Sequence, residues 1–321
     1  MKKGLLFILM AVLAVIIAAC GSASSSDSSS NEGSASTDSK TEEEELVIQH
    51  ELGETTVQKN PEKVVVFDFG ALDTLDKLGV EVAGVPQENV PSYLSKYEGE
   101  TYENVGSLKE PDFEKISEIA PDLILISGRQ AEAYEELSKI APTVFIGVDT
   151  TNYMESFANN VTMLGEIFGK EEQAKEELAT MTESVKQLNE KASASGKNGL
   201  IILSTGGKIS AYGPGSRFGI IHDEFGVTPV DENIEASTHG MSVTFEYIAE
   251  KNPDYLFVID RDQVVGGETE ASKVLDNELV NDTKAAQNGN IVYLDPEIWY
   301  LSGGGLTSVA EMVKEVDEAI Q

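Results

Sequence analysis

The chain has 321 residues and carries 56 Asp and Glu side chains against 23 Lys and Arg, which gives a formal net charge of −33. Binding to nucleic acid, or to an anionic membrane surface by charge alone, needs clustered cations, so this balance excludes both as main partners. Hydrophobic residues make up 40% of the chain, which is enough to bury a core in one large or two ordinary domains.

Residues 1–19 are predicted to be a signal peptide rather than part of the fold. Two lysines precede an apolar run from Leu5 to Ala18 that is too short for a comfortable transmembrane helix. The run ends at Cys20, the only cysteine of the chain, in a pattern that resembles the bacterial lipobox. We therefore expect cleavage before Cys20 and a lipid anchor on it, which places the protein at the cell membrane, on its extracytoplasmic face.

Residues 20–45 consist almost entirely of Ser, Ala, Gly, Asp, Glu and Thr. A segment without apolar periodicity cannot bury enough surface to fold, so this one is predicted to be a disordered tether. A short edge hairpin is predicted from Leu46 to Val57.

From Pro61 onward, continuous apolar runs alternate with helical patterns, which indicates parallel strands buried on both faces and covered by helices. In the first half, residues 46–169, the predicted strands are 64–67, 82–85, 123–126 and 143–146, and the helices are 72–78, 113–120 and 131–140. In the second half, residues 195–321, the predicted strands are 200–203, 255–259 and 291–294, and the helices are 218–225, 245–251 and 306–320. The sequence therefore predicts an α/β fold of two lobes.

Residues 170–194 are predicted to form one long helix between the two lobes. The segment is rich in strong helix formers, and one apolar stripe is made by Leu178, Met181, Val185 and Leu188. A helix of this length spans about 30 Å, so it can act as a stiff link.

A ten-residue pattern occurs in both halves, at 113–122 and at 245–254. Each copy runs from a helix through Pro-Asp into an apolar strand, and Glu114 and Glu246 hold equivalent positions. The repeat favours two lobes that arose by duplication over chance similarity between two helix–turn–strand units.

The chain has only three arginines, Arg129, Arg217 and Arg261. Two follow predicted strands directly and the third lies in a Gly-rich loop before a helix, which are the places where open α/β sheets bind ligands. Because guanidinium groups suit oxyanions and aromatic rings, we interpret the three as a binding site for an anion rather than as ordinary salt bridges.

Aromatic residues accompany the arginines. Tyr212 precedes the Gly-rich loop, and Trp299 and Tyr300 follow the last strand; packing in the core is an equal alternative for each. His239 either donates to a ligand or caps a turn, and Lys109 is expected at the surface. No motif for a catalytic serine, a Walker A loop, a zinc protease or a CxxC site is present, and three histidines are too few to favour direct capture of Zn²⁺ or Mn²⁺.

The segments that carry a resemblance are 66–70, 105–113, 236–240, 254–261 and 299–305. With the lipobox, the two lobes and the linking helix, they resemble the class III substrate-binding lipoproteins of ABC importers, which bind iron-siderophores and cobalamin. Within that family the chain is most similar to the YclQ-like, petrobactin-binding subgroup, over residues 61–321.

This resemblance implies a fold of two Rossmann-like lobes with parallel sheets joined by one long helix, and a receptor rather than an enzyme. It implies an Fe(III)-siderophore with catecholate and citrate donors as ligand, gripped by the three arginines, with the iron held by the siderophore and no cofactor or direct metal site in the protein. It also implies that Glu114 and Glu246 dock onto an ABC permease dimer with its cytoplasmic ATPase, and we expect a monomer. A haem or cobalamin receptor is the alternative, for which His239 is the only candidate imidazole.

Overall fold

The computed structural model describes residues 44–320, and these begin with a hairpin. Strands β1 (Glu45–His50) and β2 (Gly53–Gln58) pair antiparallel as a two-stranded sheet of their own, which confirms the predicted hairpin. The signal peptide, Cys20 and nearly all of the predicted tether lie outside the described residues. None of the helices in the described part of the chain has the length and apolar content needed to span a bilayer.

The first lobe is built on a sheet in which every pair of strands is parallel. In spatial order its strands are β5 (Glu103–Asn104), β4 (Gly84–Val85), β3 (Val64–Val66), β6 (Leu123–Ile126) and β7 (Thr143–Phe145). The central strands β3 and β6 are buried along their whole length, as their unbroken apolar sequences predict. Helices and turns of this lobe are α1 (Phe69–Lys77), η1 (Ser92–Glu98), α2 (Phe113–Ile119), η2 (Gly128–Ala133), α3 (Tyr134–Leu137) and η3 (Thr150–Asn152).

The second lobe contains a mixed sheet. Its strands, in spatial order, are β11 (Met241–Val243), β9 (Lys208–Tyr212), β8 (Asn198–Thr205), β12 (Tyr255–Asp260) and β13 (Ile291–Leu294), and β10 (Thr228–Pro229) also pairs with β8. Strands β8, β12 and β13 are parallel, as predicted, whereas β9 and β11 are antiparallel and were not predicted. Strand β9 turns back from β8 at Gly206-Gly207, whose positive φ angles of 55° and 75° suit a two-residue hairpin turn.

The helices of the second lobe are mostly short: α6 (Ile220–Asp223), α7 (Phe245–Lys251), α8 (Asp262–Val265), α9 (Ala271–Leu275), α10 (Glu278–Asn281) and α11 (Lys284–Gln287). The repeated pattern of the sequence corresponds to α2–β6 in one lobe and α7–β12 in the other. Both helices end in a residue with positive φ, Ala120 and Asn252, immediately before the proline that stops the helix. The two copies of the motif therefore form equivalent structures.

Two helices were predicted too long. The segment 131–140 folds as the 3₁₀ helix η2 followed by the single turn α3, and the segment 218–225 is α-helical only in α6. In the second case a tight turn precedes the helix, since Gly219 N–H donates to the Ser216 carbonyl at 2.7 Å. A 3₁₀ helix that contains Arg129 and a tight turn that contains Arg217 thus replace the first turns of the two predicted helices.

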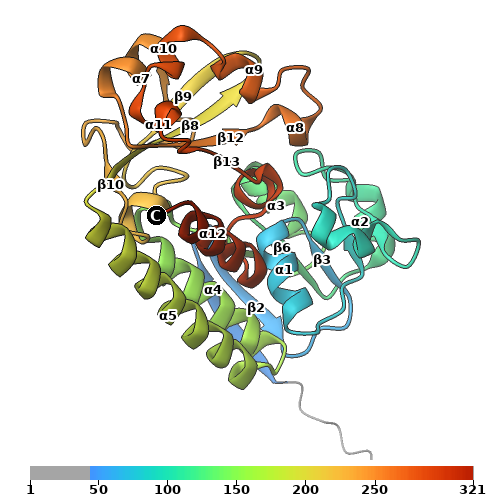
Figure 1. Cartoon of the computed structure of the whole chain (residues 1–321). Coiled ribbons are helices and arrows are strands. Elements are labelled where there is room, and N and C mark those ends of the chain that lie inside the picture. Colours follow the sequence, from blue (N-terminus) through green and yellow to red (C-terminus); the bar gives the residue numbers. More distant parts are fainter. Residues whose placement is uncertain (1–43, 321) are drawn as a thin grey trace, which may run out of the picture. The chain divides into compact units, whose positions relative to one another are not determined.

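Helix α4 (Tyr153–Ile167) and the 25-residue helix α5 (Glu171–Ser195) connect the last strand of the first sheet to the first strand of the second, and α5 runs along one edge of the molecule with α4 beside it (Figure 1). Helix α5 begins with two glutamates, which suit the positive end of a helix dipole, and ends at Gly196. Its buried face is made by Ala174, Met181, Val185, Leu188 and Ala192. The predicted linking helix is therefore present at nearly the predicted position.

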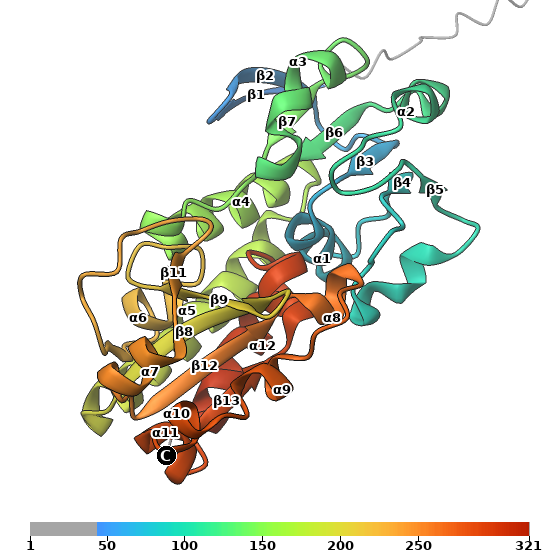
Figure 2. The same cartoon turned by 90° about the horizontal axis from the view of Figure 1, so that it is seen from above.

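The chain ends with a π-helix, η4 (Glu297–Ser302), and helix α12 (Leu306–Ala319). Helix α12 lies beside α1 and α5 (Figure 1), and the view from above shows it against the second sheet (Figure 2). Its apolar residues share one buried cluster with strands of the second lobe and with α4 and α5, whereas β3 and β6 of the first lobe lie in separate clusters.

Candidate functional site

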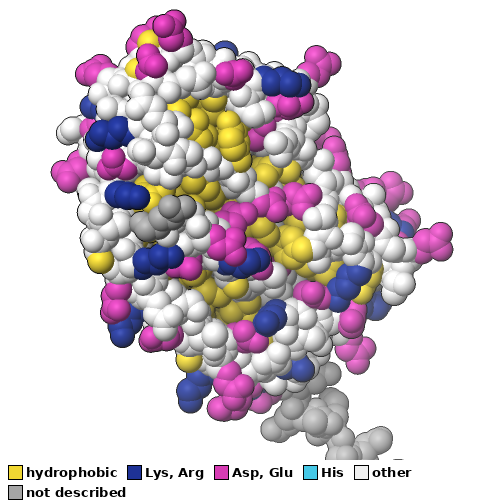
Figure 3. Space-filling view, in the orientation of Figure 1, with side chains coloured by type: hydrophobic (Ala, Val, Ile, Leu, Met, Phe, Trp, Pro, Cys, Tyr) yellow, Lys and Arg dark blue, Asp and Glu magenta, His cyan; other side chains and the backbone are white. Residues whose placement is uncertain are grey.

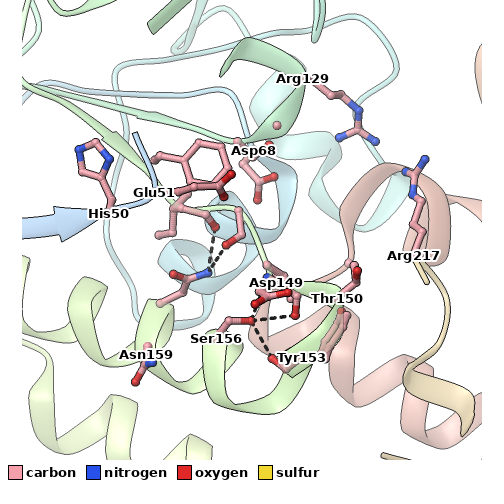
Figure 4. Close-up of a pocket in the computed structure, with 18 of the residues that line it drawn as sticks. His50, Glu51, Asp68, Arg129, Asp149, Thr150, Tyr153, Ser156, Asn159 and Arg217 are labelled. Carbon is pink, nitrogen blue, oxygen red and sulfur yellow. Dashed lines mark hydrogen bonds between the residues drawn. The ribbon is translucent and has the colours of Figure 1, made fainter. Parts of the chain in front are cut away.

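A cavity of about 1430 Å³ opens where the carboxyl-terminal ends of β6 and β7 face the loops of the second lobe. The lining residues that matter here are Asp68, Ser127, Arg129, Thr150, Tyr153, Arg217, His239, Trp299 and Tyr300. In Figure 4 the guanidinium groups of Arg129 and Arg217 point toward each other at one side of the cavity, from opposite lobes. Arg129 and Arg217 therefore meet at one place, whereas the third predicted arginine, Arg261, is not among the residues that line the cavity.

All three arginines converge on Tyr300. Its backbone carbonyl accepts a hydrogen bond from Arg129 Nη2 and another from Arg217 Nη2, both at 2.7 Å. Its phenol oxygen accepts a hydrogen bond from Arg261 Nε, also at 2.7 Å. One residue therefore holds guanidinium groups that arrive from three different loops.

The Tyr300 ring lies within cation–π range of the same groups. The guanidinium carbons of Arg217 and Arg261 lie 4.3 and 5.4 Å from the ring centroid. Burial raises the pKa of the Tyr300 phenol, but the hydrogen bond from Arg261 and the charges of Arg217 and Arg261 outweigh it and hold the pKa below its usual value. The surroundings of this phenol are thus strongly electropositive.

The positive charge of the cluster is not neutralised by ion pairs. Within residues 44–320 none of the three arginines pairs with an Asp or Glu, and every ion pair found there involves a lysine. Burial and the nearby charge of Arg217 lower the pKa of Arg129. Positive charges that are held close together in a partly buried site favour the binding of an anion.

Each arginine owes its position to a local feature. Arg129 is the second residue of η2, which starts at a capping box formed by Ser127 and Gln130. Arg217 follows the turn at Ser216, and Arg261 follows β12 directly, where its Nη1 also donates to Thr205 at 3.0 Å. The parallel strands of each sheet bring these ends to one edge, which is why a rule about strand ends could find them.

The other predicted binding residues divide into two groups. Trp299, Tyr300 and His239 line the cavity, although Trp299 is only 3% exposed and its indole donates to Glu315 at 2.6 Å. Tyr212 does not line the cavity: it is 2% exposed and packs edge-on against Phe218. The structure thus brings Tyr212 beneath the site rather than into it.

Lys109 was predicted at the surface and His239 either as a ligand donor or as part of a turn, and both side chains are exposed. Each also lines the cavity. The backbone N–H of His239 donates to Ser237 Oγ at 3.1 Å, which is the turn that the sequence favoured for this histidine.

Sequence reasoning missed Asp68, which also lines the cavity. Its carboxylate caps α1 by accepting the N–H of Ala71 at 2.8 Å. Burial raises the pKa of Asp68, and the charge of Arg129 offsets part of that effect. Asp68 follows strand β3 closely, so the rule that found the arginines would have found this residue as well.

The predicted docking residues lie on the outer surface. Glu114 and Glu246 are exposed, each in the first turn of its helix, α2 or α7. Neither forms an ion pair within the described range 44–320. On the face drawn in Figure 3, acidic side chains are mixed with Lys or Arg side chains and with apolar ones, and the basic side chains form no separate patch.

Comparison with known proteins agrees with this geometry. Residues 64–298 match the model of the family described as "Periplasmic binding protein". The chain belongs to the periplasmic binding protein family. This confirms the resemblance drawn from the sequence, and the family's two-lobed architecture accounts for the arginine cluster lying between lobes.

Three relatives of the family are particularly similar. The petrobactin-binding protein YclQ of Bacillus subtilis is 53% identical over 282 residues, which cover 87% of this chain and 89% of YclQ. The crystal structure of YclQ superposes with a TM-score of 0.85, and the match covers 87% of this chain and 99% of that chain. The ferric-anguibactin-binding protein FatB of Vibrio anguillarum is 33% identical, covering 86% of this chain and 88% of FatB. The catecholate-siderophore-binding protein VctP of Vibrio cholerae is 36% identical, with a TM-score of 0.82, covering 86% of this chain and all of that chain. These relatives are named as binding proteins.

Proposed function

We propose that the chain is the extracytoplasmic receptor of an ABC importer and captures a ferric siderophore with catecholate and citrate donors, similar to petrobactin, between its two lobes. The observation that carries this proposal is the meeting of Arg129, Arg217 and Arg261 around Tyr300, with none of the three in an ion pair within residues 44–320. The ligands named for YclQ, FatB and VctP support the same class of ligand.

The charge of such a ligand suits the cavity. Catecholate and citrate oxygens leave a ferric complex with net negative charge, and arginine presents its donors in a planar fork that matches oxyanions. The contacts with the Tyr300 carbonyl use only part of the five donors of each guanidinium, so others remain for the ligand. Each charge-assisted hydrogen bond contributes about 1.5–3 kcal/mol, so Arg129 and Arg217, which line the cavity, can supply much of the binding energy, while Arg261 acts on the ligand through the Tyr300 phenol.

The acidity of the whole chain does not oppose this. A net charge of −33 repels an anion at long range, but physiological salt screens charges beyond about 8 Å. Inside the cavity the arginines are closer to the ligand than that distance, so the local positive charge decides binding.

Titration of the intrinsic fluorescence tests the proposal, because Trp299 is the only tryptophan and lines the cavity. The purified protein would be titrated with ferric petrobactin, a ferric tris-catecholate, a ferric hydroxamate, haem and cobalamin. We expect strong quenching by the first two ligands and weak or no response to the others. Tight binding of haem or cobalamin without binding of either catecholate complex would refute the assignment.

Delivery to a permease is the second half of the proposed function. Glu114 and Glu246 are equivalent, exposed and one on each lobe, so a permease dimer with near two-fold symmetry would present one cationic patch to each. Exposed ion pairs contribute little affinity apiece and act mainly on orientation and encounter.

Replacing both glutamates by alanine tests this role. We expect siderophore affinity to stay within about twofold and uptake of labelled iron by cells to fall sharply, more than in either single variant. The matched control is Glu118→Ala with Glu250→Ala, one turn further along the same two helices, which should leave uptake intact. Full uptake in the Glu114→Ala/Glu246→Ala variant would contradict the docking role.

A further inference from the structure

Asp73 of helix α1 is a fully buried carboxylate that binds the beginning of helix α12. Its Oδ1 accepts the backbone N–H of Thr307 and its Oδ2 that of Ser308, each at 2.9 Å. The next side chain of α1, Thr74, accepts the N–H of Leu306 at 3.2 Å. The first N–H groups of α12, which have no partner within their own helix, are thus bound by residues more than 230 positions earlier in the chain.

The N-cap residue of helix α12 has no side chain that could accept the first N–H groups of the helix. Its N-cap residue is Gly305, where Ser, Thr, Asp or Asn would ordinarily supply an oxygen. A Cβ at Gly305 would lie 2.3 Å from the Asp73 carboxylate, and a Cβ at Gly70 would lie 2.5 Å from the carbonyl oxygen of Gly303. The glycine run 303–305 therefore lets α1 approach closely enough for Asp73 to take over the cap.

The capped end of α12 is joined directly to the arginine cluster. Tyr300, whose carbonyl accepts hydrogen bonds from Arg129 and Arg217, lies three residues before Gly303. The Tyr93 hydroxyl lies 3.2 Å from Asp73 Oδ2 and 2.8 Å from Ser302 Oγ, so it connects the cap to the same segment. Asp73 itself does not line the cavity.

We propose that Asp73 is a positioning residue for ligand binding: by holding the start of α12 against α1, it fixes the Tyr300 carbonyl where arginines from both lobes reach it. The proposal rests on the function proposed above and adds a residue that acts without touching the ligand. An acceptor with two oxygens, each on a different N–H, defines the position of the segment better than a single contact would.

The cost of this arrangement also points to a role beyond stability. Burial raises the pKa of Asp73 to about 6, although the hydrogen bonds from Ser308 and Thr307 act to lower it. Keeping the Asp73 carboxylate ionised in the folded protein therefore costs free energy. Asp73→Asn removes this cost but leaves one N–H of α12 without an acceptor, so the two effects on the thermal unfolding midpoint near pH 7.5 oppose each other. Ligand affinity is therefore the measurement that identifies a positioning role.

The test is the affinity for ferric petrobactin, measured by Trp299 fluorescence, in Asp73→Asn. An amide can accept only one of the two N–H groups, so we expect binding to weaken about tenfold. Thr74→Val, which keeps the volume and removes one acceptor, should weaken it about threefold. The control is Asp112→Asn, which alters an exposed cap on α2 that does not reach the cavity and should change affinity less than twofold.

A double variant separates positioning from an independent effect. If Asp73 acts through the arginines, Asp73→Asn should weaken binding less than about twofold in an Arg129→Ala/Arg217→Ala background, because both guanidinium groups that the Tyr300 carbonyl holds are then gone. Unchanged affinity in folded Asp73→Asn, or an equal loss in both backgrounds, would overturn the proposal. If Asp73→Asn does not fold, Thr74→Val decides in its place, and unchanged affinity there overturns the proposal. If the wild-type protein binds no ferric siderophore, the proposed function fails and the positioning role fails with it.

Discussion

Replacing Arg217 by alanine should weaken the binding of a ferric catecholate without unfolding the protein. Arg217 reaches the cavity from the second lobe, donates to the Tyr300 carbonyl at 2.7 Å and lies 4.3 Å from the Tyr300 ring centroid. The substitution removes one guanidinium from the ligand's side of the cavity and leaves Arg129 and Arg261 in place.

The magnitude follows from the contacts. A charge-assisted hydrogen bond to a ligand oxygen is worth about 1.5–3 kcal/mol, which corresponds to a loss of about tenfold to somewhat over a hundredfold in affinity. In the ligand-free protein the lost bond to the carbonyl is offset by relief of repulsion, because the charge of Arg217 helps to lower the pKa of Arg129. The thermal unfolding midpoint should therefore change little.

The assay is a Trp299 fluorescence titration with ferric petrobactin, run together with a thermal melt of each ligand-free variant. Arg217→Lys should give an intermediate loss, because lysine keeps the charge but not the planar fork. Lys139→Ala, which removes an exposed lysine paired with Glu136, is the control and should bind within about twofold of the wild type. Unchanged affinity in Arg217→Ala, or a large drop in its melting temperature, would show that this arginine serves the fold and not the ligand.

Three further outcomes are expected. Tyr300→Phe removes the phenol oxygen that accepts from Arg261 and should weaken ferric petrobactin about tenfold in the same titration; unchanged binding would contradict the organising role of this tyrosine. Cys20→Ala should release the protein from the membrane fraction with unchanged ligand affinity, and full membrane retention on immunoblots would contradict the lipobox assignment. Because burial raises the pKa of Asp73 from 3.8 to about 6, its contribution to stability is complete at low pH and is lost as the pH rises through 6. The free energy of unfolding of the wild type relative to Asp73→Asn should therefore fall by up to about 3 kcal/mol between about pH 4 and about pH 7.5, measured by denaturant titration; a constant difference would contradict this.

Local sequence patterns predicted most of the elements. The apolar strands β6 and β12 and the helix starts after Asp112 and Thr244 depend on residues within a few positions, so periodicity and caps reveal them. The antiparallel strand β9 was missed although its Gly-Gly turn is a hairpin signal, and β11 was missed because three residues give too little pattern.

The sequence by itself also predicted the place of two arginines within their own lobes. Arg129 follows β6 of the first sheet and Arg261 follows β12 of the second, so the rule about strand ends places each at the ligand-binding edge of its own sheet, whereas the tertiary structure decides that the two edges face each other. The family that binds such ligands followed from short motifs, and the family match over residues 64–298 confirmed it.

Only the tertiary structure decided which aromatic residue the arginines meet. Tyr212 and Tyr300 both adjoin glycine-rich loops, yet burial raises the pKa of Tyr212 to about 12 beneath the site, whereas Tyr300 lines the cavity under the influence of the arginines. The cap that Asp73 places on α12 joins residues more than 230 positions apart. Such contacts depend on how two lobes pack against one helix, and neither periodicity nor local caps carry information over that separation.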